Sequence, residues 1–243
     1  MTYGFFLLLF VVLPALGMLL LSKIRSTQQG DLKRLQWHWK GTAILAVLAF
    51  VWTTPWDNYI VSQGVWSYGV DRVFAVIGYV PLEEYAFFIL MTLFNSALFA
   101  SIFLNRMAER STWRERQSKN RFLTCLVGGL LILLTTKLRV YESNTYLAAI
   151  LLWFLPPLIL QWFFDPKTLL RRLRILTPAT LIPTLYFSLV DAFAIHDGIW
   201  TIHAATRTGW EVGLLPLEEA FFFFVTSLLL AQGLILWHSL RSK

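Results

Sequence analysis

The sequence has little charge and almost no cysteine. Only 14% of its 243 residues are Asp, Glu, Lys or Arg, and 57% are hydrophobic, whereas about a quarter of the residues are charged in a typical soluble domain. The single cysteine, Cys125, excludes an internal disulfide and any paired-cysteine metal or redox site. Together with a mean hydropathy of +0.60, these deficits point to a membrane protein.

Seven apolar segments are candidates to cross a bilayer, which takes about 20 predominantly apolar residues in a helix. They are residues 5–21, 42–56, 80–104, 122–138, 146–164, 178–195 and 214–237, and the second is the least convincing. The first has no basic region before it and no small-residue cleavage pattern, so we expect a retained helix rather than a signal peptide. The predicted fold class is therefore an all-α polytopic membrane protein.

Basic residues gather in alternate loops. Seventeen of the 21 Lys and Arg residues follow the first, third and fifth segments or lie in the C-terminal tail. Basic loops stay on the cytoplasmic side, which predicts an external N-terminus and a cytoplasmic C-terminus in a multi-pass protein of the cell membrane. The net charge of +7 then reflects topology and contact with anionic headgroups, and no nucleic-acid partner is expected.

The chain repeats itself at a spacing of 134 to 135 residues. The pattern Arg-x5-Gly-x2-Pro-Leu-Glu-Glu begins at Arg72 and again at Arg207. Three segments fall in each copy, residues 1–104 and 146–243, and residues 105–145 hold a basic loop and one linking segment. That extra crossing gives both repeats the same orientation, related by a pseudo-two-fold axis along the membrane normal.

The acids of the repeated motif are the candidate catalytic residues. Ionisable groups inside a membrane mark functional sites, and aromatic faces stabilise cations. Acids followed by aromatic residues therefore suit chemistry that begins with protonation and passes through a carbocation. The candidate acids are Glu83, Glu84, Glu218, Glu219, Asp57 and Asp191; the candidate substrate-contacting residues are Arg72, Arg207, Phe87, Phe88, Phe222, Phe223, Trp66 and Trp200.

Structural alternatives stay open for each group. The glutamates could serve only as partners of the helix dipole, and the aspartates could be interfacial acids. Arg72 and Arg207 could form ion pairs with glutamates or take part in catalysis. Trp66 and Trp200 stand where an interfacial aromatic belt is expected, and from position alone we favour the belt. No spacing of ligands suggests a metal site.

Two three-helix units, each with Pro-Leu-Glu-Glu followed by aromatic residues, resemble the lycopene cyclase domain family. The resemblance covers nearly the whole chain, and the linking segment is similar to that of the fused single-chain members. It implies conversion of the ψ ends of lycopene, or of a related linear carotenoid, to β-ionone rings without net redox change. An acid protonates C2 of the terminal C1=C2 bond, the C5=C6 bond attacks the C1 cation, and a proton leaves C6.

The resemblance also implies roles for the motif residues. Glu83, Glu84, Glu218 and Glu219 would form the acid–base set with support from the two aspartates, and the two arginines would tune which acid is protonated. No GxGxxG follows a predicted strand, so neither a flavin nor another cofactor is expected. The expected partners are the carotenoid, membrane lipid and other enzymes of the carotenoid pathway.

The two copies are not identical. Ala220 stands where the first copy has Tyr85, and Gln63 stands where Asp197 would predict an acid. The halves are therefore expected to be unequal, with one supplying the proton and the other positioning substrate.

Other functions remain in competition. A retinal protein needs a lysine in the last segment, and residues 214–237 contain none. A membrane prenyltransferase needs Asp-rich motifs for Mg²⁺ and diphosphate, and a di-metal site needs Glu-x-x-His; neither pattern is present. A carotenoid-binding or transport protein that uses the acids as a proton relay is the alternative outside the enzymes.

Overall fold

The computed structural model describes residues 1–108, 120–138 and 142–241. Six described helices are long and apolar enough to cross a membrane: Tyr3–Gln28, Leu32–Ser62, Leu82–Ile102, Glu142–Phe164, Leu173–His196 and Leu217–Leu240. A shorter apolar helix, Cys125–Lys137, brings the total to the predicted seven. The all-α polytopic fold class is confirmed.

The helices follow one another in the predicted order. The first span comprises α1 (Tyr3–Leu7), one turn of π-helix η1 (Leu8–Val12) and α2 (Leu13–Gln28). Next come α3 (Leu32–Ser62), α4 (Leu82–Ile102) and the 3-10 turn η2 (Leu104–Ala108). The linking segment contains α5 (Asn120–Leu138). The second half holds η3 (Glu142–Asn144), α6 (Thr145–Phe164), α7 (Pro166–Arg171), α8 (Leu173–His196) and α9 (Leu217–Arg241).

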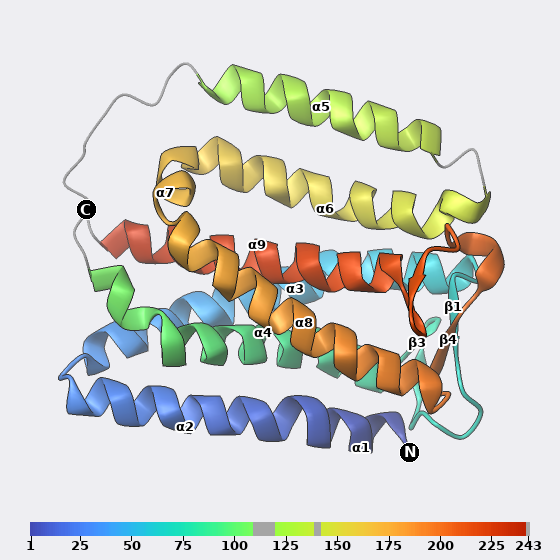
Figure 1. The fold of residues 1–243 in the computed structure, drawn as a ribbon, viewed down its shortest axis with the longest axis horizontal. Helices are drawn as coiled ribbons and strands as arrows, with labels where there is room; N and C mark the ends of the chain where they lie inside the picture. Colours follow the sequence, from blue (N-terminus) through green and yellow to red (C-terminus); the bar gives the residue numbers. More distant parts are fainter. Residues whose placement is uncertain (109–119, 139–141, 242–243) are drawn as a thin grey trace.

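The two glutamate-bearing helices occupy the centre of the bundle. In α4, 67% of the most apolar window is buried, and in α9 56%, against 22% in each of the first two spans. Helices α2 and α3 pack on α4, and α6 and α8 pack on α9, so the halves are assembled in the same way. Figure 1 shows α5 along one edge of the stack, beside α6, and α1 with α2 along the other.

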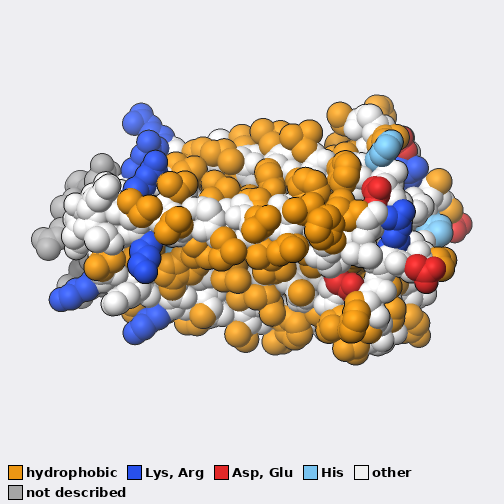
Figure 2. Space-filling model, turned by 90° about the horizontal axis from the view of Figure 1, so that it is seen from below, with side chains coloured by type: hydrophobic (Ala, Val, Ile, Leu, Met, Phe, Trp, Pro, Cys, Tyr) orange, Lys and Arg blue, Asp and Glu red, His pale blue; other side chains and the backbone are white. Residues whose placement is uncertain are grey.

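The outer surface of the bundle is apolar. Side chains such as Leu16, Val47 and Leu185 are more than half exposed and point away from the bundle. Figure 2 shows orange side chains across the middle of this face, with Lys and Arg at one end and a mixture of acidic, basic and His side chains at the other. A surface of this kind is stable in lipid rather than in water.

Helix α3 is longer than the sequence predicted. Its 31 residues include Lys33, Arg34 and Lys40, which were expected to lie in a loop. The predicted segment, 42–56, marked only the apolar part. The helix continues at both ends because polar residues can extend a helix beyond the hydrocarbon layer, where water and headgroups solvate their side chains.

Short strands, which the sequence analysis did not predict, lie in the loops at the end of the bundle where α4 and α9 begin with the Pro-Leu-Glu-Glu motif. We call this end the motif end. The strands are β1 (Trp66–Tyr68), β2 (Val76–Ile77), β3 (Val80–Pro81), β4 (Trp200–Ile202), β5 (Glu211–Val212) and β6 (Leu215–Pro216), with the 3-10 turn η4 (Ala204–Thr206) after β4. The β2–β3 and β5–β6 hairpins turn at Gly78 and Gly213, whose φ angles of 68° and 67° favour glycine. Each hairpin ends on the motif proline, directly before the first residue of α4 or α9.

Strands β1 and β4 join the two halves. They are antiparallel, and Ser67 pairs with Thr201 at the middle of the ladder. Because these two residues are 134 positions apart, the central pair of the ladder joins equivalent residues of the two copies. The roof of the motif end is therefore built symmetrically from both repeats.

Candidate functional site

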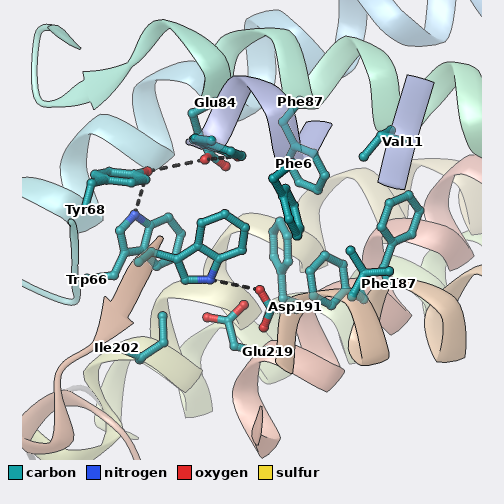
Figure 3. Close-up of a pocket in the computed structure, with 15 residues that line it drawn as sticks. Phe6, Val11, Trp66, Tyr68, Glu84, Phe87, Phe187, Asp191, Ile202 and Glu219 are labelled. Atoms are coloured by element: carbon teal, nitrogen blue, oxygen red, sulfur yellow. Dashed lines mark hydrogen bonds between the residues drawn. The ribbon is translucent and has the colours of Figure 1, made fainter. Parts of the chain in front are cut away.

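A small pocket lies at the motif end between the two halves. Its cavity volume is about 40 Å³, more than the roughly 10–15 Å³ that one water molecule needs. Helices α1, α4, α8 and α9, the π-turn η1 and strands β1 and β4 supply its walls (Figure 3). The lining residues are Tyr3, Phe6, Val11, Trp66, Tyr68, Glu84, Phe87, Phe187, Val190, Asp191, Trp200, Ile202, Glu219, Phe222 and Phe223.

Glu84 brings a carboxyl group into the pocket from the first turn of α4. It is only 9% exposed. The hydroxyl of Tyr3 donates to its Oε2 atom at 2.6 Å, and the hydroxyl of Tyr68 approaches the same atom at 3.4 Å. Burial raises the pKa of Tyr68 well above 10, and the nearby Glu84 adds to the shift, so this phenol stays protonated and acts as a donor.

Glu219 occupies the equivalent place in α9. Its Oε1 atom accepts a hydrogen bond of 2.7 Å from the hydroxyl of Tyr146. Nearby on α8, Asp191 accepts a 3.0 Å hydrogen bond from the indole of Trp200 through Oδ1, and its Oδ2 atom has no hydrogen-bond partner within the described residues. Figure 3 shows Glu84 on one side of the pocket and Glu219 with Asp191 on the other.

The first glutamate of each motif binds the loop that precedes its helix. Glu83 Oε1 accepts from the backbone N–H of Phe74 at 2.7 Å. Glu218 Oε1 accepts from both the N–H and the hydroxyl of Thr208, each at 2.6 Å. Neither glutamate lines the pocket. Adjacent helical residues point about 100° apart, so only one acid of each pair faces the cavity.

Asp57 is buried beside the pocket without lining it. It lies on α3 and is 1% exposed, and neither carboxyl oxygen has a hydrogen-bond partner among the described residues. It lies close enough to Glu84 and Glu219 to interact with both electrostatically. The alternative of a plain interfacial acid is wrong for Asp57 and for Asp191, since both are enclosed by the bundle.

The predicted aromatic residues divide between the pocket and its surroundings. Phe87, Phe222 and Phe223 line the pocket, whereas Phe88 is buried in the core outside it. Trp66 and Trp200 also line it. The belt interpretation that we favoured for the two tryptophans is therefore wrong: strands β1 and β4 fold them inward against the acids, and position along the chain could not reveal that folding.

The two arginines lie elsewhere. Arg72 pairs with Asp197 at 3.1 Å, and Arg207 pairs with Glu211 in its own loop. Neither arginine lines the pocket. The alternative of ion pairs between these arginines and the motif glutamates is wrong in this structure, because the guanidinium groups pair with Asp197 and Glu211 instead.

Sequence reasoning missed the tyrosines. Tyr3 and Tyr146 each stand at the start of the first helix of a repeat and bond the second glutamate of that repeat. They are separated by 143 residues rather than 134, because the first two helices are longer in the first half: Tyr3–Gln28 and Leu32–Ser62 have 26 and 31 residues, whereas α6 and α8 have 20 and 24. An alignment that allowed this gap would have paired them. Within the described ranges, no group of three or more His, Cys, Asp or Glu side chains is placed to hold a metal ion.

These features define a polytopic helical membrane protein with an acidic and aromatic pocket at the interface of two repeats. Comparison with known proteins adds its family. The family model described as lycopene cyclase matches residues 1–102 and 143–236, so the chain belongs to the lycopene cyclase family. The unmatched stretch between the two segments contains the linking helix α5.

Named relatives agree with the family. The chain is 40% identical over 198 residues to a lycopene beta-cyclase of Halobacterium salinarum, an alignment that covers 81% of each chain. It is 38% identical over 189 residues to a bifunctional lycopene cyclase/phytoene synthase of Phycomyces blakesleeanus, covering 74% of this chain and 31% of that one. A protein of the same description from Arthroderma gypseum is 32% identical over 219 residues, covering 81% and 36%. No solved structure matches the chain.

Proposed function

We propose that this protein is a carotenoid cyclase that converts the linear ψ ends of lycopene to β-ionone rings. The reaction is an isomerisation: one proton is added at C2, the C1–C6 bond forms, and one proton is lost from C6. Atoms and electrons balance without an oxidant or reductant. Membership of the family and 40% identity to a protein named lycopene beta-cyclase support the substrate and the ring type.

The observation that carries this proposal is the pair of buried glutamates, Glu84 and Glu219, that face one aromatic pocket from equivalent positions. Buried acids without cationic partners suit proton transfer to an apolar substrate. Both tyrosine hydroxyls at Glu84 approach Oε2, so a proton carried by Glu84 lies on Oε1. The bond from Tyr146 to Oε1 of Glu219 likewise leaves Oε2 to carry a proton.

The remaining groups support the cation and the final proton loss. The rings of Phe87, Phe222 and Trp66 wall the pocket and can stabilise a tertiary carbocation through their π faces. Asp191, whose Oδ2 atom has no hydrogen-bond partner among the described residues, would accept the proton lost from C6. Asp57 would contribute by its charge on Glu84 and Glu219 rather than by contact with substrate.

The surroundings of the two glutamates differ, as unequal halves require. Tyr68 approaches Glu84, whereas the equivalent residue in the second copy is Ile202. Asp191 accepts from Trp200, whereas the indole of Trp66 donates to Tyr68 at 2.9 Å instead of to Asp57. We assign the proton-donor role to the Glu219 side, because two phenols stabilise Glu84 as a carboxylate.

The protein would work in the cell membrane with its motif end outside and its basic end in the cytoplasm. The Lys and Arg side chains at one end of the apolar band support this orientation. The protein would consist of two repeats, residues 1–104 and 146–243, each with one glutamate motif, and a linking unit, residues 105–145. Carotenoid and lipid would be its partners, and other carotenoid-pathway enzymes could adjoin the basic end.

Expression in a lycopene-accumulating bacterium tests the function. We expect red lycopene to be converted to yellow-orange monocyclic and bicyclic products of unchanged mass, separable by chromatography. Unchanged lycopene beside well-expressed, membrane-inserted protein would overturn the proposal. Bound but unaltered carotenoid in the purified protein would favour the carotenoid-binding alternative.

A further inference from the structure

We propose that Arg72 is a positioning residue that fixes Tyr3 against Glu84, and that Arg207 has no such role in the second half. The inference rests on the proposed function and assigns a structural role to one of the two repeated arginines. It begins from the place of Tyr3, which is the first residue of α1. The first N–H groups of a helix have no partner within the helix, so other groups must bind them.

Arg72 binds the stretch before α1 from two sides. Its backbone carbonyl accepts a hydrogen bond of 2.7 Å from the N–H of Tyr3, and its Nη1 atom donates to the carbonyl of Met1 at 2.8 Å. One residue therefore brackets the segment on which the phenol of Tyr3 depends. The same side chain pairs with Asp197 at 3.1 Å, which fixes the guanidinium itself.

The turn that carries Arg72 is anchored on the other repeat. The N–H of Gly69 donates to the carbonyl of Ile199 at 2.9 Å. A Cβ atom at Gly69 would lie 2.4 Å from the carbonyl oxygen of Gly198, so the two loops touch through bare backbone. Asp71 adopts a positive φ of 60°, which is uncommon outside glycine and persists only where the surroundings enforce it.

The ring of Tyr3 is held in place by aromatic residues that line the pocket. Tyr3 is 1% exposed and makes an edge contact with Trp200 at 5.0 Å between ring centroids. It also stacks on Tyr68 at 6.4 Å. With its backbone held by Arg72 and its ring held by these aromatic groups, its hydroxyl is fixed on Glu84 Oε2. A shift of Tyr3 would remove the shorter of the two hydrogen bonds to that carboxyl group.

The second half shows why Arg207 is a matched control. Arg207 pairs with Glu211, four residues further along the same loop. Tyr146 follows the 3-10 turn Glu142–Asn144 and is the second residue of α6, and no hydrogen bond joins it to Arg207 among the described residues. Equivalent arginines thus make different contacts in the two halves.

The test compares R72Q and R207Q in the full-length protein, reconstituted in lipid nanodiscs. Hydrogen–deuterium exchange of the first helix is the readout that does not need activity. We expect the amide of Tyr3 to exchange at least tenfold faster in R72Q, to be partly protected again in R72K, and to be unchanged in R207Q. Equal exchange in R72Q and R207Q would overturn the positioning role.

Measurements of enzyme activity provide a second test. If Arg72 acts through Tyr3, the double variant Y3F/R72Q should be no slower than Y3F, and R72Q should shift the pH–rate profile in the same direction as Y3F. Multiplicative losses in the double variant, or an unshifted profile with only less folded protein, would contradict the inference. If wild-type protein forms no cyclic product, the proposed function fails, and the exchange comparison still decides the role of Arg72.

Discussion

Ser67 and Thr201 pair with each other in the β1–β4 ladder, although they occupy the same position of the two repeats. Their neighbours cross over accordingly, so that Trp66 faces Ile202 and Tyr68 faces Trp200. A local two-fold axis therefore passes through the roof of the pocket. Glu84 and Glu219 lie next to these strands on the equivalent helices α4 and α9, which explains how two motifs 135 residues apart contribute to one site.

The adjacent glutamates of each motif should respond differently to loss of charge. We expect E84Q and E219Q each to lower turnover of lycopene by about 100-fold or more, since general acid–base catalysis contributes about 10²–10⁴. The matched controls are E83Q and E218Q. Their free energy of unfolding should fall by about 1.5–3 kcal/mol, because their hydrogen bonds to the loops are weakened. The folded protein should keep most of its turnover. Equal turnover in all four variants would refute the division of roles.

Removing one hydroxyl should separate the tyrosines from packing effects. In Y3F and Y146F the ring stays and only the hydrogen bond to Glu84 or Glu219 is lost. We expect turnover to fall about tenfold or more in each, because a bond to a buried carboxyl group is worth about 1.5–3 kcal/mol. The measurement is kcat and KM in nanodiscs, and a change confined to KM would assign the hydroxyls to substrate binding instead.

Asp57 should show opposite effects on stability and activity. A buried carboxyl group without hydrogen bonds destabilises a fold, so D57N is expected to raise the Tm by about 2–4 °C, corresponding to about 1 kcal/mol for a chain of this size. Turnover should fall at the same time, since Asp57 interacts with both pocket glutamates. Thermal unfolding and initial rates on the same preparation check this, and unchanged turnover would make Asp57 a structural residue only.

The order of the first helix should depend on pH through Asp197. A hydrogen bond from the Met1 ammonium, with further help from the charges of that ammonium, Arg72 and His196, holds the pKa of Asp197 below its ordinary 3.8. A lowered pKa means that the anchor is complete above about pH 3.8 and is lost as pH falls through the lower, folded-state value. Between neutral and mildly acidic pH, hydrogen exchange of residues 1–7 in the wild type, corrected for intrinsic exchange, should therefore not change through titration of Asp197. In D197N this exchange should be faster over the same range, and the difference from the wild type should disappear as pH falls below the folded-state pKa of Asp197.

Much of the fold and part of the site could be predicted from the sequence. The apolar segments and the repeated motif determine the helices and their order, because burial in lipid leaves few other structures. The inward tryptophans depend on short strands, whose two or three residues carry no periodic signal, and the partners of the arginines depend on how the loops beside these strands fold. The division between Glu83 and Glu84 was accessible, since neighbours on a helix cannot share a face. Tyr3 and Tyr146 were hidden because the helices of the two halves differ in length.

The most direct test of acid-initiated cyclisation is the isotope content of the product formed in D₂O. Purified protein in nanodiscs would convert lycopene after its exchangeable acids have been equilibrated with deuterium. We expect up to one deuterium per ring, located at ring C2, because the proton added there comes from an exchangeable carboxyl group and the proton lost comes from C6. Cyclic product that contains no deuterium would contradict it.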